Sequence, residues 1–157
     1  MVTTLAGSAK GYIDNVGAAA LFNTPIGIAV DVTGNVYVAD TGNHRIRKVT
    51  PGGDVTTVAL SVSGFLDGTG TNTRFNTPRG MCLDKAGNLL IADTNNHQIR
   101  KLTPAGELST LVGSSDGYID DAGRKARFSF PTAVAVDGSG NMYIADLRNF
   151  RIRKVQP

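Results

Sequence analysis

The chain has one cysteine, no tryptophan and no long apolar run among its 157 residues. Cys82 alone cannot form an intrachain disulfide, and it excludes a metal site built only from cysteines within one chain. No apolar run approaches the roughly 18 residues that a membrane-spanning helix needs, so no membrane is expected among the partners. The 16 basic and 13 acidic side chains give a net charge of +3, an excess too small to indicate nucleic acid as the partner by itself.

The sequence also lacks a helical period of apolar residues, which argues against helical elements. It contains 19 glycines at short and regular intervals, as expected of a chain with many tight turns. The N-terminus carries no charged-then-apolar signal pattern. Both ends of the sequence fall inside repeated elements, which fits a fragment of a longer protein or a shortened chain as well as a whole one.

One segment, NVYVADTGNHRIRKV from Asn35 to Val49, occurs three times at a constant offset of 53 residues. It returns as NLLIADTNNHQIRKL from Asn88 and as NMYIADLRNFRIRKV from Asn141. The same offset relates Pro25, Pro78 and Pro131. A fixed period of this size is typical of solenoids, propellers and arrays.

Each repeat contains four short runs that are typical of strands. In the first repeat they are GIAVD (27–31), VYVAD (36–40), RIRKVT (45–50) and VTTVALS (55–61). Gly34-Asn35 suits a tight antiparallel reversal between the first two runs, and Pro-Gly-Gly turns the chain into the fourth. Four antiparallel strands in 53 residues match the size and content of a β-propeller blade.

A long connection precedes the first strand of each blade, at residues 8–25, 62–78 and 115–131. It opens with Gly-aromatic-aliphatic-Asp-x-x-Gly and closes on a phenylalanine three residues before the repeated proline. Connections of this length are usually functional or packed by their own side chains, and the repeated phenylalanine favours packing. Because strand direction alternates, this connection and the loop between the second and third strands must share one face of the ring. We call it the loop face.

We therefore expect an all-β fold, with residues 1–157 as a single half-propeller domain of three blades at about 8–60, 61–113 and 114–157. Propellers typically have about four to eight blades, so three blades cannot close a ring. The initial run, VTTLAG, lacks a blade, and the last blade lacks its outer strand. Two copies around a two-fold axis would give a six-bladed ring. In this homodimer, residues 1–7 of each copy would exchange to become the outer strand of the other copy's last blade.

The repeat unit P-x-G-I-A-V-D-x-x-G-N-x-Y-V-A-D-T-x-N-H-x-I-R-K resembles the NHL repeat, a family of mostly six-bladed propellers. Its residues run from Pro25 to Lys48 in the first blade. The third blade departs most, with Ala133 for Gly, Leu147 for Thr and Phe150 for His. The resemblance implies six blades in the ring. It also implies protein or RNA binding, as in some members, or a zinc- and calcium-dependent lyase activity, as in another.

Positions that differ between repeats are the better ligand-binding candidates, because residues needed by every blade should be alike. At the start of the first strand the differing residues are Ile26, Arg79 and Thr132. Between the second and third strands they are Gly42, Asn95 and Arg148.

The third blade also carries a basic cluster on its expected loop face. The cluster consists of Arg124, Lys125, Arg127, Arg148 and Arg151, with Phe150 nearby. Such a cluster suits phosphate or an acidic protein surface. Phe130 and Phe150 are the only rings expected close to it, fewer than single-strand nucleic-acid binders usually use.

The repeated polar residues are better explained by the fold than by chemistry. His44 and His97 invite a metal site, but Phe150 replaces them in the third blade, so we expect packing, with one ring nitrogen bonded to a loop carbonyl. Asp40 with Asn43 is expected to cap turns, and the RIRK side chains are expected to lie over apolar neighbours with their heads in water or on a neighbouring blade.

No nucleophile–base pair stands apart from the repeats, and we expect no catalysis, metal or cofactor. The leading hypothesis is a non-catalytic scaffold that binds a protein or small ligand at the loop face. The alternatives are RNA or anion binding through the basic cluster, and a metal-dependent lyase or hydrolase.

Overall fold

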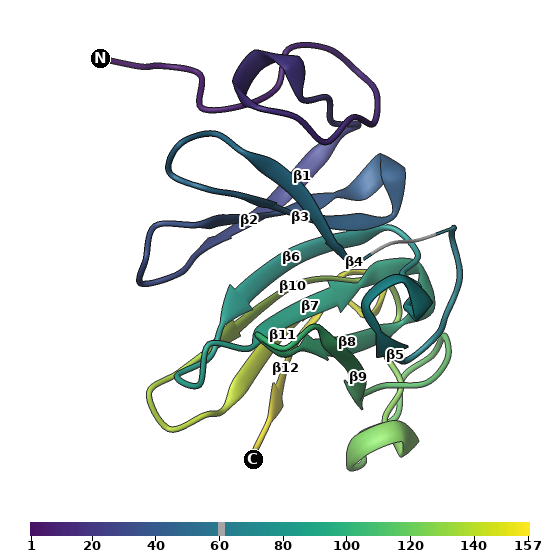
Figure 1. Ribbon diagram of the computed structural model, residues 1–157. Coiled ribbons are helices and arrows are strands. Elements are labelled where there is room, and N and C mark those ends of the chain that lie inside the picture. Colours follow the sequence, from purple (N-terminus) through teal and green to yellow (C-terminus); the bar gives the residue numbers. More distant parts are fainter. Residues whose placement is uncertain (60–61) are drawn as a thin grey trace.

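The computed structural model describes residues 1–59 and 62–157, which form three antiparallel sheets (Figure 1). The sheets follow one another along the chain as three blades. The all-β class and the four-strand blade are therefore confirmed for the first two repeats. The expected boundary between these blades, at residues 60 and 61, lies outside the described residues.

The first blade has the strand order β1-β2-β3-β4. Its strands are β1 (Pro25–Val30), β2 (Val36–Asp40), β3 (Arg45–Val49) and β4 (Val55–Ala59). The 3₁₀ turn η1 (Gly17–Ala19) lies in the connection before it, and η2 (Thr41–Asn43) joins β2 to β3.

The second blade repeats this order and adds a two-residue strand outside its outer strand. Its strands are β6 (Pro78–Leu83), β7 (Leu89–Asp93), β8 (Gln98–Leu102), β9 (Glu107–Val112) and the added β5 (Gly68–Thr69). Its 3₁₀ turns are η3 (Gly70–Asn72) and η4 (Thr94–Asn96).

The third blade has three strands in the order β10-β11-β12. They are β10 (Pro131–Val136), β11 (Met142–Asp146) and β12 (Arg151–Val155), with the 3₁₀ turns η5 (Gly123–Lys125) and η6 (Leu147–Asn149). Among the described residues, no strand pairs with the outer edge of β12.

The tight reversal between the first two strands is closed by an aspartate. Asp31 Oδ1 accepts the backbone N–H groups of Thr33 and Asn35, both at 2.9 Å, and Gly34 takes the left-handed conformation with φ +84°. A short carboxylate that bonds backbone two and four residues on, followed by glycine, explains why this sequence turns here. Hydrogen bonds from the Asn35 and Thr33 side chains, and to a smaller extent these backbone bonds, hold the pKa of Asp31 below its usual value.

Residues 1–7, expected to form a strand, are not one in the single chain. Met1 and Val2 are fully exposed. The physical reason is that a strand needs a neighbour for its hydrogen bonds, and the edge expected to receive this segment belongs to β12. The N- and C-termini lie at opposite ends of the molecule, so the segment cannot reach β12 of its own chain (Figure 1).

The blades pack most closely through their inner strands, β1 against β6 and β6 against β10. A Cβ atom at Gly27 would lie 2.1 Å from the carbonyl oxygen of Arg79, and one at Gly80 would lie 2.7 Å from that of Thr132. Such distances are far inside van der Waals contact. Glycine is therefore required where one inner strand crosses the next.

The core lies between the blades rather than within a single sheet. Ala29, Ala39 and Ile46 of the first blade pack against Met81 and Ile91 of the second in one buried cluster. A second cluster joins the second and third blades in the same way. Each junction thus buries apolar side chains from both blades, and the middle blade has a neighbour on both sides.

Candidate functional site

The loop face is built in each blade by the long connection and the 3₁₀ turn between the second and third strands. In the first blade the Gly42 N–H donates to the Asn23 carbonyl (2.9 Å), and Asn43 Nδ2 donates to the Gly11 carbonyl (2.8 Å). The equivalent bonds recur in the second and third blades. The expectation that these two loops share one face is confirmed.

A buried charged network lies directly beneath this face. In the first blade Arg47 Nη1 is 2.9 Å from Asp40 Oδ2, and its Nη2 is 2.6 Å from Asp14 Oδ1. Asp40 also accepts the Asn23 N–H and the Asn43 side-chain amide. Arg100 and Arg153 repeat the pairing in the other blades. The network therefore ties both loops to the third strand.

This network corrects the expectation for one arginine of each RIRK run. The side chain of Arg47 is fully buried and pairs inside its own blade, instead of reaching water or a neighbouring blade. The long connection of the same blade folds over it, and the carbonyls of Leu21 and Ile13 accept its hydrogen bonds, so the guanidinium group has no access to solvent. A guanidinium group can be buried here because carboxylates and loop carbonyls accept its hydrogen bonds.

The two histidines link successive blades. His44 Nδ1 accepts the N–H of Thr77 (2.9 Å), and His97 Nδ1 accepts that of Phe130 (3.2 Å). The expected bond to a loop carbonyl is wrong, because the partner is a donor on the next blade. Burial lowers the pKa of both histidines and favours the neutral ring that can accept this bond.

Phe150 occupies the same left-handed position, with φ +55°, but its side chain is 93% exposed. A second hydrogen bond between blades was not predicted from the sequence. Thr41 Oγ1 donates to the Pro78 carbonyl (2.7 Å), and Thr94 repeats this bond to the third blade. In the third blade Leu147 occupies the equivalent position, and its side chain has no hydroxyl group to donate. The departures of the third repeat therefore coincide with the contacts that a following blade would make.

The three candidates at the start of the inner strand have different surroundings. Ile26 is half exposed. Arg79 is partly buried, and its Nε has no hydrogen-bond partner among the described residues. Thr132 lines a hollow together with Leu147, Phe150 and Ile152 on the free side of the third blade.

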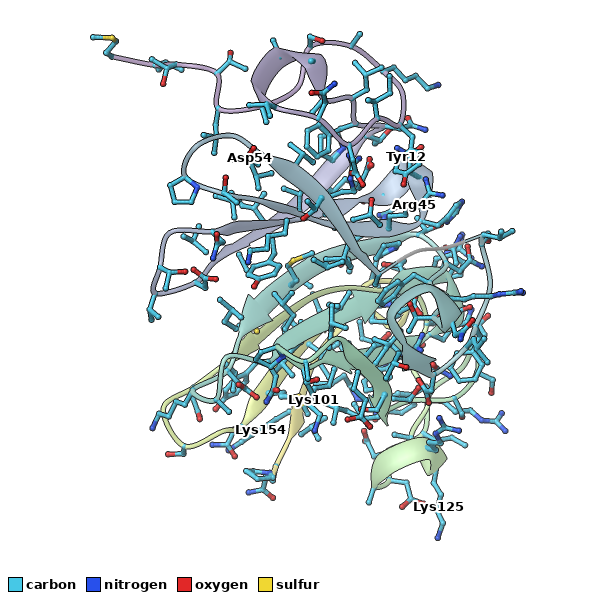
Figure 2. The ribbon with its side chains drawn as sticks, in the orientation of Figure 1. Tyr12, Arg45, Asp54, Lys101, Lys125 and Lys154 are labelled. Atoms are coloured by element: carbon cyan, nitrogen blue, oxygen red, sulfur yellow. The ribbon has the colours of Figure 1, made fainter. Side chains whose placement is uncertain are left out.

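The basic cluster is divided by the structure. Arg124 forms an ion pair with Asp67 of the second blade at 2.6 Å, and Arg151 lies over the Tyr118 ring at 4.2 Å. Arg127 is exposed, and Lys125 projects from η5 at the rim (Figure 2). Tyr118 is an aromatic partner that the sequence argument missed. The repeated aromatic residue of the connection was the available signal, since the Arg45 guanidinium group stacks on the Tyr12 ring at 3.6 Å in the first blade, where Figure 2 shows the two residues side by side.

Arg148 is the cluster member best placed to meet a ligand. Its guanidinium group lies 3.6 Å from the centre of the Phe130 ring, and the His97 ring meets Phe130 edge-on. Among the described residues this guanidinium group makes no hydrogen bond, but its charge acts on Asp116, whose pKa is lowered mainly by a Ser129 side-chain hydrogen bond and to a smaller extent by Arg148. Gly42 and Asn95 hold the equivalent places: Gly42 packs on Asn23, and Asn95 Nδ2 donates to Thr77 Oγ1.

Other chemical groups are less prominent. In the part of the chain that the structure describes, no three His, Cys, Asp or Glu side chains gather as metal ligands. Burial raises the pKa of Cys82 to about 11, so its thiol is protonated and a poor nucleophile at neutral pH. Within the described residues, no helix is long and apolar enough to cross a bilayer.

Residues 22–49 and 75–102 match the family model described as NHL repeat. The chain belongs to the NHL-repeat family. The segment that carries Ala133, Leu147 and Phe150 lies outside the matched residues.

Three relatives show how far the similarity of this NHL-repeat chain extends. Bovine (Bos taurus) NHL repeat-containing protein 2 is 41% identical over 99 residues, 60% of this chain and 14% of that protein. A probable peptidyl-alpha-hydroxyglycine alpha-amidating lyase of Caenorhabditis elegans is 25% identical, covering 92% of this chain and 40% of its own. An auxiliary nutrient binding protein from Bacteroides ovatus has a TM-score of 0.74 and 29% identity, over 89% of this chain and 38% of its own.

The chain thus spans less than half the length of each of these relatives. Its structural neighbours are propellers, and its three sheets resemble propeller blades.

Proposed function

We propose that this NHL-repeat chain is a non-catalytic binding scaffold, whose ligand surface is the loop face of a six-bladed ring made from two copies. One observation carries the binding role. The repeated pair of Asp40 and Arg47 lies buried beneath the loop face, whereas Arg148, at the position that changes between blades, stacks its guanidinium group on an aromatic ring without a hydrogen bond among the described residues. A polar network held in this way supports a surface rather than a reaction.

The two-copy ring is supported by the unfinished ends of the arc. On the first blade, Ile28 and Val30 are exposed, although the equivalent Met81 is buried against a preceding blade. On the third blade, Ile152 is 75% exposed, whereas Ile46 is fully buried. Both ends therefore offer the apolar surfaces that internal junctions bury, and a ring of six such blades buries them all.

The ligand class follows from Arg148. A guanidinium group is a planar fork of donors that matches a carboxylate, and stacking on Phe130 holds it in place. We therefore expect a small carboxylate or an acidic protein segment. The Bacteroides ovatus relative, by its name, binds nutrients, which supports a small ligand for this surface.

Binding of citrate, as a small carboxylate, and of a polyglutamate peptide tests this function by calorimetry. One of the two probes is expected to bind, and Arg148→Gln should weaken that binding about tenfold or more, since charge-assisted hydrogen bonds contribute about 1.5–3 kcal/mol. Arg127→Gln, an exposed arginine of the same blade, is the control and should leave it unchanged. Equal loss in both variants, or no binding of either probe, would contradict the proposal.

RNA binding is the second candidate, and the stacked pairs Arg148–Phe130 and Arg151–Tyr118 favour it. Acidic groups lie among these cations, since Asp120 pairs with Arg153 and Asp116 lies 3.7 Å from His97. We expect them to repel a nucleic acid, which carries one negative charge per nucleotide and must cross several of these groups, more strongly than a small carboxylate that meets Arg148 alone. Fluorescence anisotropy with a labelled 20-nucleotide poly-uridine should show little binding. Tight binding that falls steeply with salt would reverse the order of the two candidates.

A further inference from the structure

The third blade ends on a sheet edge whose partner strand can be specified residue by residue. In the first blade, β4 pairs with β3 through Val55–Val49, Thr56–Lys48, Thr57–Arg47 and Ala59–Ile46. The second blade has the same register between β9 and β8. The outer edge of β12 has no such partner among the described strands. A strand that fits this edge must therefore resemble β4 and β9.

Residues 2–6 have the sequence of the missing strand. VTTLA at residues 2–6 matches VTTVA at 55–59, and it ends, as β9 does, before a glycine with positive φ. Shifting the observed register by the repeat period pairs Val2 with Val155, Thr3 with Lys154, Thr4 with Arg153 and Ala6 with Ile152. Within one chain these residues are at opposite ends of the molecule (Figure 1). A second copy can bring them together.

Asp120 supplies an independent observation, because no threonine among the described residues donates to it as one does to its equivalents, and its Oδ2 accepts the Tyr118 hydroxyl group instead (2.8 Å). Thr57 donates its N–H and its hydroxyl group to Asp14, both at 3.1 Å, and the Thr110 hydroxyl donates to Asp67 at 3.1 Å. The side chains of Asp14 and Asp67 are 38% and 31% exposed, whereas that of Asp120 is 70% exposed. The residue that completes this network by position is Thr4.

The surfaces beside these strands also complement each other. The free side of the first blade has an apolar hollow of about 220 Å³, which the N-terminal residues Leu5 and Ala6 line together with Ile28 and Val38. The free side of the third blade presents Leu147, Phe150 and Ile152, all exposed. Leu147 faces the place where a following blade would bring Pro25, so an apolar contact replaces the threonine bond of the internal junctions.

We infer that β12 of one copy takes residues 2–6 of a second copy as its outer strand, and that Thr4 of the second copy completes the network of Asp120 and Arg153. This inference rests on the proposed two-copy ring and specifies how its halves are joined. Each copy gives its N-terminal strand to the other, so the ring contains two identical exchanged junctions related by the two-fold axis.

The pair Val2–Val155 allows a direct covalent test. Its internal equivalent, Val55–Val49, is a non-hydrogen-bonded pair, because the Val55 N–H donates to the Asn15 carbonyl, away from β3. Side chains in such pairs are closest and suit a disulfide. In a Cys82→Ala background, Val2→Cys and Val155→Cys copies are expressed separately and together. A disulfide-linked dimer is expected only when both are present.

The internal pair Val49→Cys with Val55→Cys, in the same background, serves as the positive control and should form a disulfide within one chain. Light scattering on the wild-type protein separates the two proposals. A monomer at micromolar concentration would overturn both the ring and the strand exchange. A dimer in which the mixed cysteine copies do not cross-link, while the internal control does, would overturn the exchange and leave the ring standing.

Thr4→Val provides a second measurement with an isosteric change. Removing the hydroxyl group should raise the dimer dissociation constant about tenfold or more, because a hydrogen bond to a charged group is lost at each of two junctions. Thr3→Val is the matched control, since its equivalent Thr56 is exposed and makes no such bond. Equal dissociation constants for the two variants would contradict the role given to Thr4.

Discussion

At the scale of single residues, the repeated aspartate and arginine beneath the loop face determine whether a blade can form its loops. Arg100 in the second blade is fully buried and bonds both Asp93, which is also fully buried, and Asp67. Breaking a buried pair leaves a charge without compensation, which costs more than the intact pair contributes. The network is therefore a condition of folding, and stability is the property in which its loss would show.

Arg100→Met keeps most of the side-chain volume and removes the charge. We expect the free energy of unfolding to fall by about 3–5 kcal/mol, because Asp93 remains buried without its partner. Chemical denaturation measures this change. Lys101→Met, at the next and less buried position of β8, should cost less than about 1 kcal/mol. A similar loss in both variants would show that the buried pair is not the cause.

At the scale of elements, the strands and their turns could be predicted well from the sequence because their patterns recur in the three repeats. Pro-Gly-Gly, Gly-Asn and the alternating runs specify local geometry, and the repeats remove the ambiguity of any single copy. The unpredicted features are contacts between segments far apart in sequence. Burial of Arg47 by its own connection, the bond from the Thr77 N–H to His44, and the pairing of Arg124 with Asp67 depend on how the loops fold over the blade.

The N-terminal segment shows that a strand-like sequence does not by itself form a strand. Its sequence is that of a strand, and the copies of that sequence at β4 and β9 are strands. Residues 1–7 are not, because pairing requires an edge that the single chain does not bring to them. Propensity specified the type of element, whereas the presence of a neighbour decided whether it formed. The candidate site was predicted to the same extent: the face, Arg148 and a nearby Phe130 were indicated, but the stacking of Arg148 on the Phe130 ring was not.

The histidine hydrogen bonds between blades make the stability of the two internal junctions depend on pH. Burial is the main cause of the lowered pKa of His44 and His97, and each neutral Nδ1 accepts an N–H from the next blade. A histidine whose folded pKa is lowered stabilises the fold above its unfolded pKa, about 6.5. That contribution is lost as the pH falls through the folded pKa. We therefore expect these links to weaken between pH 7 and pH 5.

The double variant His44→Phe with His97→Phe copies the residue of the third blade and should reduce this loss. Thermal unfolding of both proteins at pH 7 and pH 5 gives the comparison, with a smaller fall in the midpoint expected for the variant. Burial raises the pKa of Asp93 to about 6, so this carboxylate acts in the opposite sense in the same window. Asp93 is present in both proteins, so its effect on the pH dependence cancels when the two are compared. Equal pH dependence would exclude the histidines as its source.

At the scale of the whole molecule, the three junctions of a half-ring are not equivalent. The two internal junctions cross at Gly27 and Gly80, where a Cβ atom would lie 2.1 Å and 2.7 Å from a carbonyl oxygen of the next blade. The closing junction of the proposed ring has Ala133 at this position. Its Cβ would meet the Ile26 carbonyl of a second copy, so the inner strands must stand further apart there. The exchanged outer strands would then hold most of the contact.

Ala133→Gly removes this obstacle and should let the closing junction approach the internal geometry. We expect the dimer dissociation constant, measured by sedimentation equilibrium, to fall about tenfold, which corresponds to about 1.4 kcal/mol of association free energy. Ala135→Gly lies on the same strand and is the contrasting control. Its equivalent Ala29 packs against the next blade, so the loss of this methyl group should weaken association. If Ala133→Gly also weakens association, the Ala133 methyl group makes a favourable contact in the dimer. The inner strands would then lie close together at the closing junction, which would contradict the wider spacing inferred here.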